Sequence, residues 1–134
     1  MLELSTEMLM LCLSVILGLI QLMAAAQGSS AQRGLSWNLS PREEKKPDLT
    51  GIPGRLDRSF KNFLETFPFF LAAVAGVQLL NRHGTLSVLG SEIYFACRLI
   101  YVPIYILGIR GLRTLIWMGS IIGLIMILVQ QFLV

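Results

Sequence analysis

The stretch that decides the fold is RLDRSFKNFLETFPFF, residues 55–70. It begins with charged side chains and ends in a hydrophobic run. A helix turns by about 100° per residue, so four of the polar side chains of this stretch share one face. They are Arg55, Arg58, Asn62 and Glu65. Because apolar residues continue the helix, this polar stripe enters a bilayer, where ionisable groups usually face a bundle interior or a wet cavity.

The composition predicts an integral membrane protein. The chain has 134 residues, of which 54% are hydrophobic and 14% are charged. A membrane span needs about 20 mostly apolar residues, and irregular backbone cannot face lipid. We therefore predict one all-α domain over 1–134, a bundle of four transmembrane helices. The predicted spans are 7–26, 57–80, 86–107 and 113–133, and a Gly- and Pro-rich loop at 27–56 is expected to break any long helix from Gly28 onward.

The placement of the basic residues predicts the orientation. Seven of the eleven Lys and Arg lie between Arg33 and Lys61, and Arg110 and Arg113 lie between the third and fourth spans. The positive-inside rule then places both basic loops in the cytoplasm and both termini in the lumen or periplasm. Acidic residues interleaved in the first loop argue against nucleic acid as a partner.

Three residues of the long loop are typical of a membrane surface. Trp37 suits an anchor at the level of the lipid headgroups. Arg33 and Arg42 are expected to hold the loop to anionic lipid. Membrane lipid is therefore a predicted partner of this loop.

Neither a metal site nor a redox dithiol is predicted. Cys12 and Cys97 lie in apolar spans, with no CxxC or Cys/His spacing. His83, the single histidine, lies in the turn between the second and third spans, where we expect an exposed residue without a role.

An ion pair is predicted inside the bundle. Glu65 lies roughly 12 Å, and Arg98 roughly 13 Å, from the cytoplasmic ends of their helices at 1.5 Å per residue. A lone charge at that depth would be penalised by several kcal/mol. We therefore expect Glu65 to pair with Arg98, within a subunit or across an interface, while Arg55 lies at the surface.

The cytoplasmic third of the predicted bundle gathers a basic, phenol-bearing pocket. Its members are Arg58, Asn62, Tyr101, Tyr105, Arg110 and Arg113. Arginine binds carboxylates through two parallel hydrogen bonds. An Arg or Tyr beside a thiol stabilises the thiolate, which is the nucleophilic form. The pocket thus suits an anionic solute that meets a lipophilic one.

Two motifs carry a resemblance to a known family. RSFKNFLE at 58–65, followed by FPF at 67–69, resembles the second-helix signature of the MAPEG superfamily, the membrane-associated proteins in eicosanoid and glutathione metabolism. RLIYVPIY at 98–105, followed by Arg113 and Thr114, resembles the second signature of that superfamily. The likeness covers nearly the whole chain and is nearest to the bacterial branch.

The resemblance implies a homotrimer with glutathione bound as co-substrate between neighbouring subunits. The residues that it assigns to the glutathione site are Arg58, Lys61, Asn62, Glu65, Arg98, Tyr101, Tyr105 and Thr114. Arg113 matches the arginine that stabilises the thiolate, with Tyr105 beside it, and Arg110 is a rival for that role. The branch implies a bacterial inner membrane.

The function that follows is a membrane-bound glutathione transferase, with glutathione peroxidase activity as a second reaction, that acts on lipophilic electrophiles. The alternative is a non-catalytic membrane protein of the same fold that only binds or assembles, in which the polar stripe is a structural network. A four-span exporter is a third class. Such exporters usually need a carboxylate inside the first span, and the interior of this span has none.

Overall fold

The computed structural model describes residues 3–133 and is entirely helical over that range, apart from turns and loops. Its helices are α1 (Thr6–Arg33), α2 (Leu35–Leu39), α3 (Gly51–Leu80), α4 (Thr85–Leu107) and α5 (Leu112–Phe132). All of these except the short α2 are long and apolar enough to cross a membrane. The predicted architecture of four candidate membrane-spanning helices is confirmed.

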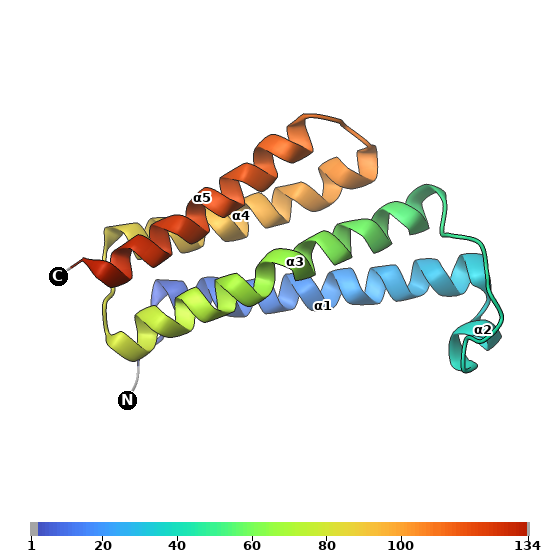
Figure 1. Ribbon diagram of the computed structural model, residues 1–134, viewed down its shortest axis with the longest axis horizontal. Coiled ribbons are helices and arrows are strands. Elements are labelled where there is room, and N and C mark those ends of the chain that lie inside the picture. The colour runs from blue at the N-terminus through green and yellow to red at the C-terminus, as the bar shows by residue number, and fades with distance from the viewer. Residues whose placement is uncertain (1–2, 134) are drawn as a thin grey trace.

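The four long helices pack as two pairs (Figure 1). α1 lies beside α3, and α4 with α5 forms a hairpin that packs on them. The start of α1, the α3–α4 turn and the end of α5 lie at one end of the bundle, while α2 and the α4–α5 turn lie at the other. We call the end that holds α2 and the α4–α5 turn the α2 end.

The hydrophobic core is centred on side chains from all four long helices. Leu11, Phe70, Val77, Tyr94 and Ile127 belong to it. The rings of Phe70 and Tyr94 stack with their centroids 3.9 Å apart. The buried hydroxyl of Tyr94 lies 3.0 Å from Oγ1 of Thr66 in α3, so the polar tip of this core residue is satisfied.

The first helix is longer than predicted, and the predicted break at Gly28 does not occur. A Cβ atom at Gly28 would lie 3.2 Å from Cα of Pro53, so this glycine allows α1 and α3 to approach closely. Hydrogen bonds join the hydroxyls of Ser29 and Ser30 to the side chain of Asn38. The helix ends instead at Gly34, whose φ of 94° favours glycine. Tertiary contacts thus override the weak helix propensity of residues 28–30.

The opposite end of the bundle holds a buried carboxylate. Glu7 is 1% exposed and accepts a hydrogen bond from the hydroxyl of Ser87 in α4. Nδ1 of His83 lies 3.2 Å from the same carboxylate. The expectation that His83 has no role is therefore wrong, because the turn folds back over the start of α1. Glu7 is therefore a buried carboxylate in the first turn of α1, outside the interior of the span, where no carboxylate was expected.

The α4–α5 hairpin depends on two glycines that face each other. A Cβ at Gly123 would lie 2.6 Å from the carbonyl oxygen of Gly90, and the reverse distance is 2.5 Å. Gly119, one turn earlier, faces the sulfur of Cys97 at 2.8 Å. Gly119 and Gly123 form the GxxxG pair of the sequence, and both serve close helix packing.

We predict that Gly123→Ala lowers stability more than Gly119→Ala does. The new methyl group meets rigid backbone at position 123, whereas at position 119 it meets a side-chain sulfur that can rotate. Overpacking of this kind costs about 1–3 kcal/mol. Thermal unfolding of the two purified variants in the same detergent measures the difference, and equal midpoints would contradict the packing described here.

Candidate functional site

One face of α4 presents a column of cationic and aromatic side chains. Arg98, Tyr101 and Tyr105 follow at spacings of three and four residues, which places them on one side of the helix. The guanidinium carbon of Arg98 lies 4.4 Å from the ring centroid of Tyr101 and 5.8 Å from that of Phe63 in α3. The rings of Tyr101 and Tyr105 are 5.6 Å apart. Arg98 is 1% exposed, so its charge is held within the bundle by cation–π contacts.

Three helices converge on Tyr105 at the α2 end. Nε of Arg58, from α3, donates a hydrogen bond of 3.2 Å to the phenol oxygen. The guanidinium carbon of Arg113, from the first turn of α5, lies 4.8 Å from the Tyr105 ring centroid. Glycines with positive φ at Gly108 and Gly111 form the turn that brings α5 back to this position. Two cations and one phenol therefore meet here, with Tyr105 and Arg113 half-buried and Arg58 exposed.

Arg55 has a different place from the predicted one. Its Nη1 donates a hydrogen bond of 2.8 Å to the carbonyl oxygen of Ile106, near the C-terminus of α4, and the residue is half-buried. The expectation of a surface residue is wrong. A cation at this position satisfies one of the last carbonyls of the helix and complements its dipole.

The other predicted site residues lie around this cluster without joining it. Lys61 is exposed and forms an ion pair of 3.0 Å with Asp57, one turn earlier in α3. Glu65, Arg110 and Thr114 are exposed on the outer surface of the chain. Asn62 is half-buried, and its Oδ1 atom is buried without a hydrogen-bond partner among the described residues.

The predicted ion pair between Glu65 and Arg98 is not formed within the chain. The ion pairs of residues 3–133 do not include either side chain. The reason is the orientation of α3: Phe63 and Thr66 point into the bundle, and Glu65 between them points outward. Aromatic rings take the place that the carboxylate was expected to have.

Arg98 consequently keeps unused hydrogen-bonding capacity. Its Nε and Nη1 atoms are buried and have no hydrogen-bond partner among the described residues. Buried polar groups are nearly always paired, and an unpaired buried donor costs about 1–3 kcal/mol. Arg98 thus carries a buried charge whose hydrogen-bonding capacity is not fully used by the described residues.

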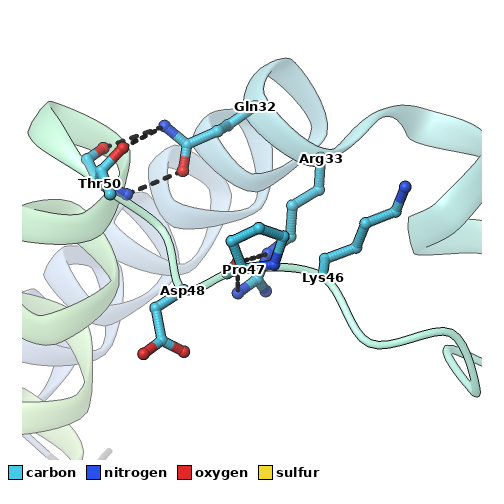
Figure 2. Close-up of a pocket in the computed structure, with 6 residues that line it drawn as sticks. All are labelled: Gln32, Arg33, Lys46, Pro47, Asp48 and Thr50. Atoms are coloured by element: carbon cyan, nitrogen blue, oxygen red, sulfur yellow. Dashed lines mark hydrogen bonds between the residues drawn. The ribbon is translucent and has the colours of Figure 1, made fainter.

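Apart from the cluster around Tyr105, a hollow of about 430 Å³ lies between the end of α1 and the loop that follows α2 (Figure 2). The amide of Gln32 exchanges hydrogen bonds with the backbone and hydroxyl of Thr50, at 2.8 to 3.2 Å. Nε and Nη2 of Arg33 both donate to the carbonyl oxygen of Pro47. These hydrogen bonds hold the loop against the end of α1, so the residues around the hollow have a structural role. No pattern in the sequence indicates that Gln32 makes these bonds.

Comparison with known proteins tests the resemblance. The family model described as MAPEG family matches residues 8–133, nearly the whole chain. The chain belongs to the MAPEG family. Members of this family generally use glutathione as a substrate. Neither the search of curated proteins nor that of solved structures gave a match.

For this MAPEG protein we predict that the ring of Tyr101, more than its hydroxyl, stabilises the bundle. Tyr101→Leu removes the aromatic face over Arg98 and should lower the free energy of unfolding by about 2 kcal/mol. Tyr101→Phe retains a ring and should lose far less. Thermal unfolding in detergent compares the two, and an equal loss in both variants would show that the hydroxyl carries the effect.

Proposed function

We propose that this protein is a membrane-bound glutathione transferase with an additional glutathione peroxidase activity. The observation that carries the proposal is the convergence of Arg58 and Arg113 on Tyr105. Two cations beside one phenol suit a ligand that has carboxylates at its ends and an acidic thiol in its middle. Family membership independently favours glutathione as that ligand.

In the proposed reaction Arg58 binds a carboxylate of glutathione, and Arg113 stabilises the thiolate. Arg113 is half-buried against Tyr105, whereas Arg110 is exposed in the turn, so the geometry favours Arg113 over Arg110. Charge stabilisation is stronger where water is partly excluded. The Tyr105 hydroxyl already accepts a hydrogen bond from Arg58, so its own proton can be donated to the sulfur.

The thiolate then attacks a lipophilic electrophile that arrives from the bilayer. In the transferase reaction a carbon–sulfur bond forms, and the leaving group departs with the electron pair. In the peroxidase reaction the thiolate attacks the terminal oxygen of a lipid hydroperoxide: an S–O bond forms, the O–O bond breaks, and the alkoxide takes up a proton from solvent and leaves as the alcohol. The thiol of a second glutathione then attacks the resulting sulfenic acid, forms glutathione disulfide and releases the oxygen as water.

The remaining assigned residues fit a site between subunits of a homotrimer. Glu65 and Thr114 are exposed on the outer surface of one subunit, where a neighbour could cover them. Oδ1 of Asn62 and the free nitrogens of Arg98 are buried without partners within one subunit. We propose that bound glutathione or the neighbouring subunit supplies these partners, and that Lys61 and Tyr101 border the same site.

The proposed setting is a bacterial inner membrane with the α2 end in the cytoplasm. Arg33 ends α1, Arg42 follows α2, and Arg58 and Arg113 lie near the starts of α3 and α5. Figure 1 shows these parts of the helices at that end. The positive-inside rule supports this orientation. The thiol reaction would then draw on glutathione from the cytoplasm and on electrophiles from the adjacent leaflet.

One observation favours the alternative of a non-catalytic binding protein. Arg98 is 1% exposed and packed by the rings of Phe63 and Tyr101, so at least this charge has a structural role. Such a protein would retain glutathione binding and show no turnover. Conjugation of glutathione to an aromatic electrophile by the purified protein distinguishes the two functions.

We predict that Arg113→Ala abolishes most thiolate formation, with Arg110→Ala as the matched control. One well-placed arginine can lower the pKa of a bound thiol by about two units, which corresponds to about 2.7 kcal/mol. Without it, the thiol ionises only at higher pH, so the rise of the rate with pH should move upward by about two pH units. Ultraviolet absorbance of the thiolate at neutral pH measures the loss. A larger loss in Arg110→Ala would reverse the assignment.

We predict the opposite pattern for Arg58→Ala. This variant removes a carboxylate contact, so the KM for glutathione should rise about tenfold or more, while the pKa of the bound thiol changes little. Steady-state kinetics over a range of glutathione concentrations up to saturation gives KM and kcat separately, and the pH dependence of kcat reports the pKa of the bound thiol. A fall in kcat with an unchanged KM would contradict a binding role for Arg58.

A further inference from the structure

An amphipathic hollow runs along α1 toward the loop, outside the tyrosine cluster. Its apolar part is lined by Leu22, Ala26 and Phe60, and the charged side chains of its polar part are Arg33, Arg42 and Asp57. Eleven residues of helix separate Leu22 from Arg33, a distance of about 16 Å at 1.5 Å per residue. This is about half the thickness of the hydrocarbon core of a bilayer. The hollow therefore has the length of one leaflet, with charge at one end only.

Both arginines of this hollow lack an acidic partner. The ion pairs of the described range involve other residues. Their guanidinium carbons lie 5.1 Å and 5.6 Å from the ring centroid of Trp37. The indole ring thus binds both cations, and the two like charges repel each other. An anion between them would relieve this repulsion and form charge-assisted hydrogen bonds.

The loop holds both side chains in place before any ligand arrives. Arg33 is fixed by its two bonds to the carbonyl oxygen of Pro47, which Figure 2 shows beside the clamp between Gln32 and Thr50. Nε of Arg42 donates to the carbonyl oxygen of Asn38, at 3.3 Å. A preorganised pair of cations loses less conformational entropy on binding.

The same two arginines also line an adjoining polar hollow of about 540 Å³. Four cationic and two acidic side chains surround it, and one of the acids, Asp57, is already paired with Lys61. A headgroup placed there meets net positive charge, while the apolar hollow begins beside it. The two hollows together have the polarity pattern of one phospholipid.

We propose that this double hollow is a binding site for a single anionic phospholipid. Its phosphate lies between Arg33 and Arg42, and one acyl chain follows α1 past Ala26 and Leu22. Glutathione and free phosphate esters fit less well, because neither has a long apolar part to occupy the hollow between α1 and Phe60. Arg58 and Lys61 also line the polar hollow, so the headgroup end of the lipid site borders the proposed glutathione site, while the acyl-chain end along α1 lies outside it.

Native mass spectrometry of the purified protein in a mild detergent tests this site. Phosphatidylglycerol should form an adduct of one lipid per subunit, and phosphatidylcholine should bind about tenfold more weakly, because its cationic headgroup cancels the phosphate charge. Arg42→Gln should weaken the phosphatidylglycerol adduct about tenfold. Lys45→Gln is the matched control: it removes a cation from the same loop that lines neither hollow, and binding should be unchanged.

The apolar half of the site has its own variant. Ala26→Trp fills the hollow beside α1 and should also abolish the adduct, while Ala31→Trp, an exposed control on the same helix, should not. Equal retention of the two lipids, or equal losses in Arg42→Gln and Lys45→Gln, would overturn the proposal. So would displacement of the lipid by glycerol 3-phosphate at a matched concentration, because the bound group would then be a simple anion.

Discussion

The burial of the Arg98 guanidinium against aromatic rings is the interaction on which the site depends. A charge inside an apolar bundle is penalised by several kcal/mol unless its surroundings compensate. Here Phe63 from α3 and Tyr101 from α4 supply that compensation. Because Tyr101 packs on Tyr105, the same contacts fix the height at which Arg58 and Arg113 meet the second phenol. The position of the candidate site follows from where this one charge is held.

The contacts that join the helices differ between the two ends of the bundle. Close helix packing at Gly90 and Gly123 joins α4 to α5, and the stacked rings of Phe70 and Tyr94 join α3 to α4. At the α2 end the contacts between α3, α4 and α5 are polar instead. Polar contacts can be exchanged for contacts to a ligand, whereas a packed apolar core cannot rearrange without loss of stability. The candidate site therefore lies at the end where the helices are joined by hydrogen bonds that a ligand can replace.

Much of the site could be predicted from the sequence, because helical periodicity decides which side chains share a face. The stripe through Arg58 and the column through Tyr101 and Tyr105 follow from spacing alone, and the structure brings the two together. Glu65 does not pair with Arg98 within the chain, since similar depth does not ensure that two side chains point toward each other. The roles of Arg55 and His83 were missed for a related reason: each contacts an element far away in the sequence, near Ile106 and Glu7.

The sequence by itself determined the four membrane helices, the membership of the MAPEG family and the face of each helix that carries polar groups. Hydrophobic length and periodicity are local properties, and a bilayer leaves few alternatives to helices. Only the tertiary structure decided the length of α1, the aromatic surroundings of Arg98 and the gathering of Arg33 and Arg42 over Trp37. These features depend on the rotation of each helix about its axis and on the path of the loop, which are settled by packing between distant residues.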